Sequence, residues 1–289
     1  MILVTGATGT TGIDIVRMLT GMGVRVRAMT RDPERARALP GFEGAEVVFG
    51  EAAQPETLAA AYAGVEKLML IPPSEENWGA LQHNMIAAAQ KSGVQHVVHI
   101  SAMGVSPEAP SMSLSLHYEA ERELEKSGMA FTHLRPNSFM QNTLKFYLPT
   151  IKSNGVIYQC TGNAKMALID TRDLAEIAVL ALTRDEHRGK TYELTGPEAL
   201  NYTEAAAQLS AELGRPVSYT DLSAAEYEQA VVSAGLPAWL GAEIGNIYSK
   251  GYYGTGKGAR VTDMVRAVTG REPRSFRQFV RDHAAHFAP

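Results

Sequence analysis

The chain contains a single cysteine, Cys160, among its 289 residues. A disulfide within the chain is therefore impossible, and a metal centre built from several cysteines is excluded. The eight histidines are scattered and show no His-Glu-x-x-His spacing, so the sequence predicts no metal site. The lack of cysteine pairs fits a reducing compartment, and we expect the protein to be cytoplasmic.

Long apolar runs and an excess of positive charge are also missing. No apolar stretch reaches the roughly 18 residues that a membrane helix needs, and the first residues do not resemble a signal peptide. The formal net charge is -4, so the basic footprint of a nucleic-acid-binding protein is absent. No Gly-x-Ser-x-Gly motif of a hydrolase occurs. We therefore expect a soluble protein without a membrane or nucleic-acid partner.

What the sequence does contain is a glycine-rich turn near its start. Residues 1–4 are typical of a short buried strand, and apolar residues at helical spacing begin at Ile13. Strand, glycine turn and helix, in this order, are the context of a phosphate-binding fingerprint. Free N–H groups at the start of the helix would bind the anion. The sequence predicts a dinucleotide site that includes Gly6, Thr8, Gly9, Thr10, Thr11 and Gly12.

The segment after the second predicted strand, residues 24–29, bears on the choice of nucleotide. In a dinucleotide fold this strand end meets the adenosine ribose, where an acidic residue binds NAD and an arginine accommodates the 2′-phosphate of NADP. Arg31, supported by Arg35, therefore predicts NADPH. Asp32 could instead accept a hydrogen bond from a ribose hydroxyl, and with Pro33 it also fits an ordinary helix start.

Strands and helices alternate as far as residue 142. This rhythm predicts a Rossmann-type doubly wound α/β fold with a parallel sheet. Ligands of such sheets bind at the carboxyl ends of the strands. We therefore expect cofactor contacts from residues that follow the fourth and fifth strands, namely Ile71, Pro72, Ser101 and Ala102.

The chain changes character between and beyond these strands. Residues 106–115, rich in proline and serine, predict a mobile loop before a charged helix at 116–126. Past residue 142, short strands and then helices dominate. We place a dinucleotide-binding domain at residues 1–150 and a smaller, mostly helical α/β substrate lobe at 151–289. Some strands of this lobe can return to the main domain.

Several stretches resemble the NmrA-like atypical short-chain dehydrogenases, in particular the quinone- and dye-reductase branch. The similarity covers nearly the whole chain and is specific for fold and NAD(P) binding, but not for substrate. The stretches that carry it are residues 4–12 (Val-Thr-Gly-Ala-Thr-Gly-Thr-Thr-Gly), 30–33, 93–101, 127–136, 139–142, 169–173 and 189–196.

The resemblance implies candidate catalytic residues. Short-chain dehydrogenases use a serine, a tyrosine and a lysine four residues after the tyrosine. Here Ser101 and Tyr118 occupy the first two positions, but the third is Arg122. His117 matches a histidine of the quinone-reductase-like branch and could donate a proton. Alternatively, Tyr118 packs its ring, Arg122 pairs with Glu119 or Glu125, and His117 only joins loop to helix.

The resemblance also places residues near the nicotinamide and suggests an acceptor. Pro136, Asn137 and Phe139 are expected beside the nicotinamide ring. Because the lysine is missing, an acceptor that takes a hydride directly at an electron-poor ring is favoured. Aromatic and methionine side chains could form a flat slot for it, although many of them also fit a core; they are Phe139, Met140, Phe146, Tyr147, Trp239, Tyr252 and Tyr253.

Two functions follow from these observations. The first is an NADPH-dependent oxidoreductase, monomeric or homodimeric, that transfers a hydride to a quinone or another planar aromatic molecule. A variant of it is aromatic polyketide tailoring, in which reduction is linked to hydroxylation. The second is a non-catalytic NADP-binding redox sensor, which the missing lysine would favour.

Overall fold

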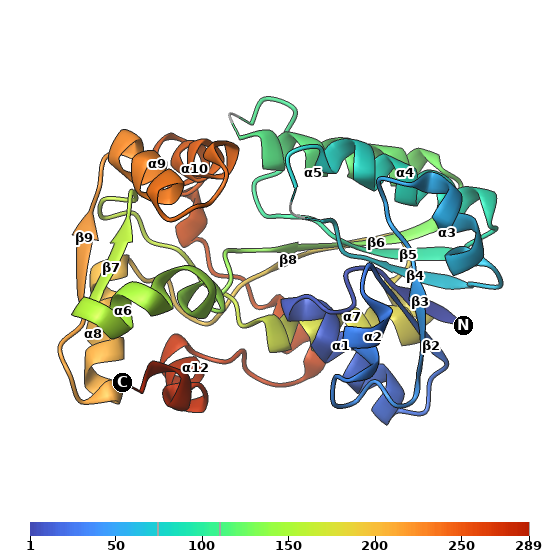
Figure 1. Ribbon diagram of the computed structural model, residues 1–289, viewed down its shortest axis with the longest axis horizontal. Helices are drawn as coiled ribbons and strands as arrows, with labels where there is room; N and C mark the ends of the chain where they lie inside the picture. The colour runs from blue at the N-terminus through green and yellow to red at the C-terminus, as the bar shows by residue number, and fades with distance from the viewer. Residues whose placement is uncertain (74, 110, 289) are drawn as a thin grey trace. The chain divides into compact units, whose positions relative to one another are not determined.

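The structure is a computed structural model that describes residues 1–73, 75–109 and 111–288 (Figure 1). Its main feature is a seven-stranded sheet in the order β3-β2-β1-β4-β5-β6-β8. All the pairings from β1 to β6 are parallel. The strands are β1 (Ile2–Val4), β2 (Val26–Thr30), β3 (Ala45–Phe49), β4 (Lys67–Leu70), β5 (His96–Ile100), β6 (Ala130–Pro136) and β8 (Lys190–Leu194).

Helices cover both faces of this sheet, with α1 and α7 on one face and α3, α4 and α5 on the other (Figure 1). The helices that alternate with the strands are α1 (Thr10–Gly21), α2 (Pro33–Arg37), α3 (Pro55–Tyr62), α4 (Trp78–Lys91), α5 (Met112–Lys126) and α7 (Thr171–Thr183). Because both faces are covered, β1 and β5 are buried throughout. The predicted Rossmann-type doubly wound sheet is therefore confirmed. The strand order reverses direction between β1 and β4, where such sheets bind ligands.

The chain divides into two compact units, but not at a single boundary near residue 150. The first unit comprises residues 1–102, 116–135 and 174–192, and the second comprises residues 103–115, 136–173 and 193–289. Most of α7 and β8 thus belongs to the first unit, although both follow residue 150 in sequence. The physical reason is that β8 extends the main sheet beside β6, a return of a later strand to the main domain that the sequence allows.

The second unit is mostly helical, as the sequence predicts, and has a small sheet of its own. Its strands, β7 (Val156–Gln159) and β9 (Ser218–Asp221), pair in parallel. Its core includes Leu209, Phe276 and Phe279, all essentially fully buried. The helices are α6 (Leu148–Asn154), α8 (Tyr202–Leu213), α9 (Ala224–Ser233), α10 (Ala238–Gly245), α11 (Met264–Thr269) and α12 (Phe276–Asp282).

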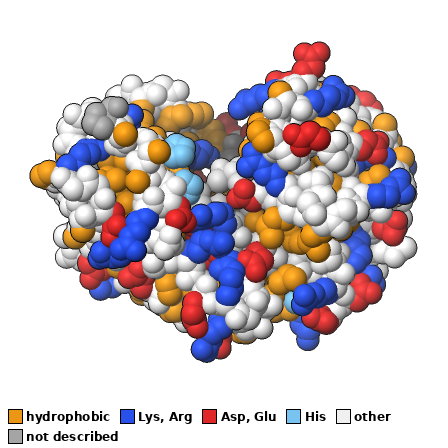
Figure 2. Space-filling model, turned by 90° about the horizontal axis from the view of Figure 1, so that it is seen from below, with side chains coloured by type: hydrophobic (Ala, Val, Ile, Leu, Met, Phe, Trp, Pro, Cys, Tyr) orange, Lys and Arg blue, Asp and Glu red, His pale blue; other side chains and the backbone are white. Residues whose placement is uncertain are grey.

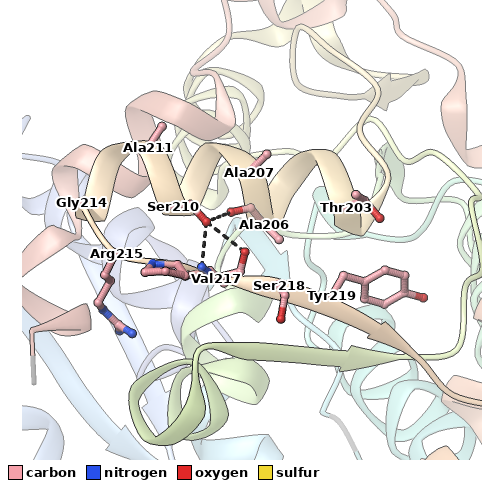
Figure 3. Close-up of a pocket in the computed structure, with 11 residues that line it drawn as sticks. Thr203, Ala206, Ala207, Ser210, Ala211, Gly214, Arg215, Val217, Ser218 and Tyr219 are labelled. Carbon is pink, nitrogen blue, oxygen red and sulfur yellow. Dashed lines mark hydrogen bonds between the residues drawn. The ribbon is translucent and has the colours of Figure 1, made fainter.

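An open pocket in the second unit lies between α8 and β9 (Figure 3). Ser210 joins the two elements there. Its hydroxyl donates to the carbonyl oxygens of Ala206 and Val217 and accepts from the Val217 N–H at 2.8 Å. The pocket is lined by small side chains of α8 and by the start of β9. Among its lining residues, the titratable ones are Arg215 and Tyr219.

The helix after β5 begins earlier than the sequence predicts. The predicted loop at 106–115 ends in helix, because α5 starts at Met112. Glu243 of α10 explains this start, since its carboxylate accepts from the N–H groups of Met112 (3.1 Å) and Ser113 (2.8 Å) and from the Ser111 hydroxyl. A distant acceptor thus caps the helix. Pro110, also part of that predicted loop, lies outside the described residues.

None of the helices in the described part of the chain combines the length and the apolar composition that a membrane-spanning helix needs. On the face shown in Figure 2, Lys and Arg side chains are interspersed with Asp and Glu rather than gathered into one basic area.

Candidate active site

The turn between β1 and α1 has the backbone that its glycines predict. Gly6 has a φ of 56°, in the left-handed region that favours glycine. A Cβ on Gly12 would lie 2.2 Å from the carbonyl oxygen of Gly6, so only glycine fits where α1 meets the turn. The Gly9 N–H donates to the same carbonyl at 2.9 Å and closes the turn.

The start of α1 is suited to bind an anion. Gly9 is the residue before the helix, and no side chain caps it. The first N–H groups of a helix have no partner within the helix, and they carry a partial positive charge. Gly6, Gly9 and Thr10 are exposed, Thr8 is half-buried, and Thr11 and Gly12 are buried. This exposed, uncapped backbone fits the diphosphate of a dinucleotide.

Thr5 ties this turn to the end of β4. Its hydroxyl lies 3.2 Å from the carbonyl oxygens of Met69 and Ile71, to which it donates, and it accepts from the Ile71 N–H at 2.9 Å. A Cβ on Gly6 would lie 3.2 Å from the Ile71 side chain. Ile71 therefore lies beside the glycine turn, with Pro72 next in the chain. Their contact with a nucleotide stays a prediction.

Arg31 follows β2, at the same edge of the sheet as the glycine turn. Its side chain is 65% exposed, and it pairs with Glu75 at 2.6 Å and with Glu51 at 3.7 Å. The Asp32 carboxylate is already used within the protein, because it accepts a hydrogen bond from the Arg35 N–H and caps α2. The helix-start interpretation of Asp32 is thus confirmed. Contact of Arg31 with a 2′-phosphate stays a prediction.

Ser101 lies at the end of β5, and its hydroxyl is hydrogen-bonded to the buried ion pair of Glu121 and Arg135. Its hydroxyl donates to the Glu121 carboxylate at 2.6 Å, and Arg135 binds the same carboxylate at 2.8 and 2.5 Å. Burial opposes ionisation of Glu121, but the hydrogen bonds from Arg135 and Ser101 outweigh it and hold its pKa below the ordinary value. The Ser101 proton therefore points at Glu121, which leaves the hydroxyl oxygen able only to accept. Ala102, the next residue, is half-buried.

His117 lies inside the first unit, among other rings. Its ring centroid is 5.0 Å from that of Trp78 and 5.8 Å from that of His99. Burial lowers the pKa of His117 to about 4, and its Nδ1 has no hydrogen-bond partner within the described part of the chain. A histidine that is neutral at pH 7 is a poor general acid. Its catalytic role stays a prediction, which this setting disfavours.

Acid should destabilise the protein through its buried histidines. Burial lowers the pKa of His96, His117 and His133 from 6.5 to about 4. Between these values the unfolded chain binds protons that the folded chain does not. Stability present above pH 6.5 is therefore lost as the pH falls toward 4, by up to about 1.4 kcal/mol per pH unit for each histidine. We expect the melting temperature to change little from pH 7.5 to 6.5 and to fall increasingly as the pH is lowered from 6.5 to 4.5.

Two variants make this test specific. His117→Leu should reduce the slope of the melting temperature against pH, because one buried histidine no longer contributes. His83→Gln, which changes a largely exposed histidine paired with Glu123, should leave the slope unchanged. A melting temperature that is constant over the interval in the unmodified chain would contradict the prediction.

Tyr118 and Arg122 share a face of α5, as their spacing predicts. The Arg122 guanidinium lies over the Tyr118 ring, 5.3 Å from its centroid. The same guanidinium pairs with Glu125 and lies 3.7 Å from Glu121. The predicted Arg122–Glu125 pair is thus confirmed. Arg122 contacts the face of the ring, so the arrangement differs from a lysine that lowers the pKa of a catalytic tyrosine.

The residues expected beside the nicotinamide lie in the second unit. Pro136 is buried at the end of β6, and Asn137 follows it. The Asn137 amide donates to the Gly258 carbonyl at 2.9 Å and accepts from the Ser138 N–H at 2.7 Å. The amide nitrogen therefore holds the loop that carries Gly258, and the amide oxygen binds the backbone of the next residue. Phe139 is half-buried, beside Ile169, and its contact with a cofactor stays a prediction.

The aromatic and methionine side chains of the second unit divide into two groups. Met140, Tyr147 and Tyr253 are buried in its core, as the alternative interpretation requires. Phe146 and Tyr252 are partly buried against that core, and Trp239 is half-buried. Only the second group, with Phe139, retains surface that a planar acceptor could contact.

Sequence reasoning missed Glu121, which forms the centre of the polar cluster under Ser101. A signal for it existed: His117, Ala120, Glu121 and Leu124 share one buried face of α5. A carboxylate within an apolar stripe is rarely buried without a partner. Its partner Arg135 lies in β6, and only the fold shows that this side chain reaches Glu121.

Comparison with known proteins places this chain among reductases. Residues 1–256 match the NmrA-like family. The NAD(P)H azoreductase of Xenophilus azovorans is 37% identical over 290 residues, 99% of each protein. Quinone oxidoreductase 2 of Escherichia coli is 35% identical over 243 residues, 83% of this chain and 84% of that protein. The crystal structure of the Escherichia coli NADPH-dependent quinone oxidoreductase QOR2 with NADPH superposes with a TM-score of 0.86 at 29% identity, covering 99% of this chain and 100% of that one. The chain belongs to the NmrA-like family.

Proposed function

We propose that this protein transfers a hydride from NADPH to a quinone or another planar aromatic acceptor. That it is an NAD(P)H-dependent oxidoreductase follows from its relationship to an NAD(P)H azoreductase and to quinone oxidoreductase 2. The observation in the structure that carries the proposal is the uncapped start of α1, with Gly9 exposed before it. This backbone would hold the diphosphate. Bound NADPH would supply the hydride.

The side chains around the end of β5 support an acceptor that needs no strong acid. The Ser101 proton is held by Glu121, and the ring of His117 is buried with a pKa of about 4. Tyr118 has Arg122 against its ring instead of a lysine four residues on. None of these three groups is therefore placed to act as a strong proton donor to a carbonyl oxygen. A quinone or an azo dye takes a hydride at its electron-poor conjugated group and a proton from water, whereas a cationic triphenylmethane dye takes the hydride alone.

The proposal predicts NADPH oxidation with planar acceptors. The test follows NADPH absorbance with a naphthoquinone, an azo dye and a triphenylmethane dye, and a simple aliphatic ketone serves as the negative substrate. We expect turnover with at least one aromatic acceptor and none with the ketone. Tyr118→Phe should lower kcat by less than roughly tenfold, because removal of a true general acid costs about 10²- to 10⁴-fold.

Two results would contradict this proposal. Tight NADPH binding without turnover of any acceptor would favour the NADP-binding redox sensor. A loss of 10²-fold or more in the kcat of Tyr118→Phe, with NADPH affinity unchanged, would restore Tyr118 as a proton donor.

Within the proposed function, one acceptor is a quinone formed in aromatic polyketide assembly. Its reduction would prepare the ring for hydroxylation.

A further inference from the structure

Three strand ends bring three charged side chains together beside the glycine turn. Arg31 follows β2, Glu51 follows β3 and Glu75 comes after β4. In the sheet β2 lies between β3 and β1, and β4 lies on the other side of β1, so these ends share one edge. The Arg31 guanidinium spans this edge, with its Nη1 2.6 Å from Glu75 Oε1 and its Nε 3.7 Å from Glu51 Oε2.

The two carboxylates differ in how firmly they are held. The Glu51 side chain is 17% exposed, and its Oε1 also accepts from the Ala53 N–H at 3.3 Å, within the loop after β3. The Glu75 side chain is 35% exposed, and the hydrogen bond that the structure gives it is the one from Arg31. Glu75 is therefore the partner that an incoming anion can displace from the guanidinium.

The two nicotinamide nucleotides make different demands on this pair. A 2′-phosphate carries between one and two negative charges at neutral pH. To bind the Arg31 guanidinium it must replace the Glu75 carboxylate, which remains close to the phosphate. A 2′-hydroxyl carries no charge and can donate a hydrogen bond to a carboxylate. Like charges roughly 5 Å apart in solvent weaken binding about three- to tenfold. Glu75 therefore penalises NADPH and not NADH.

We infer that Glu75 determines coenzyme selectivity, by competing with the 2′-phosphate of NADPH for Arg31. The protein accordingly uses NADH as well as NADPH. Its affinity for NADPH exceeds its affinity for NADH by a smaller factor than it would if Glu75 were absent. The inference rests on the proposed function, because it requires a nicotinamide nucleotide at the glycine turn.

The test measures dissociation constants of NADPH and NADH by calorimetry for the unmodified protein, Glu75→Gln and Arg31→Ala. In Glu75→Gln we expect NADPH to bind roughly three- to tenfold more tightly and NADH to change less than about twofold. Arg31→Ala should weaken NADPH by about tenfold or more and NADH little. Glu76→Gln removes a neighbouring exposed carboxylate and should leave both constants within about twofold, which separates the Arg31 contact from net charge.

Each other outcome has a distinct meaning. Equal tightening of NADPH and NADH in Glu75→Gln, or weaker NADPH binding, would overturn the inference while leaving the proposed function intact. The second result would mean that Glu75 holds Arg31 in place for the phosphate. If the unmodified protein binds neither nucleotide, the proposed function itself fails, and the inference fails with it.

Discussion

Gly12→Ala is expected to destabilise the protein and to weaken NADPH binding by roughly 10- to 100-fold. The new Cβ would lie 2.2 Å from the Gly6 carbonyl oxygen and 2.9 Å from the Ala7 Cα, and neither backbone atom can move alone. The turn must open, at a cost of about 1–3 kcal/mol, which the better helix propensity of alanine offsets only in part. An opened turn no longer presents the N–H groups at the start of α1 to a diphosphate. Urea unfolding and calorimetry with NADPH measure the two effects.

The matched control is Gly21→Ala, at the other end of the same helix. A Cβ there would meet no atom within 4 Å. We expect this variant to bind NADPH normally and to be as stable as the unmodified chain or slightly more stable. If Gly12→Ala and Gly21→Ala behave alike in both measurements, the close approach of α1 to the turn is not what makes glycine necessary.

Asp173→Ala should lower the free energy of unfolding by about 2–3 kcal/mol, because the partly exposed side chains of Arg271 and Arg274 lose the buried carboxylate that they share. Asp173 lies in the first turn of α7 and is fully buried. Its carboxylate accepts from the Arg271 guanidinium at 2.7 Å, from the Arg274 backbone N–H at 2.7 Å, and also from the Arg274 side chain. The segment before α12 is thereby fixed to the start of α7. Urea unfolding followed by circular dichroism measures the loss.

Glu186→Ala serves as the comparison, since Glu186 is 68% exposed and lies 3.9 Å from Arg184. Such exposed pairs contribute roughly 0–1 kcal/mol, so this variant should unfold within about that range of the unmodified chain. An Asp173→Ala variant that unfolds within 1 kcal/mol of the unmodified protein would show that the two arginines find other partners at little cost.

Local patterns predicted the elements that depend on neighbouring residues. Helix α1, at Thr10–Gly21, contains the helical spacing predicted from Ile13, because that spacing and the glycine turn before it lie within one short segment. The glycine turn was equally readable, since its shape depends on backbone freedom at Gly6 and on the absence of a side chain at Gly12. The family resemblance, read from similar short motifs, was confirmed.

Features that depend on distant partners were not readable in the same way. The start of α5 is set by Glu243, more than a hundred residues away. The division into two units depends on β8 joining the main sheet beside β6. The side-chain setting of Ser101 and His117 likewise came from Glu121 and Trp78, which only the fold brings next to them.

The amino-acid sequence by itself determined the Rossmann-type sheet, the glycine turn and the family, because each depends on periodicity or on residue type over short spans. The tertiary structure alone decided how the candidate chemical groups are used. The Ser101 hydroxyl donates its proton to Glu121, burial lowers the pKa of His117 to about 4, and Arg31 is paired with Glu75. Protonation and charge depend on burial and on partners from other strands, and those partners become neighbours only when the chain folds.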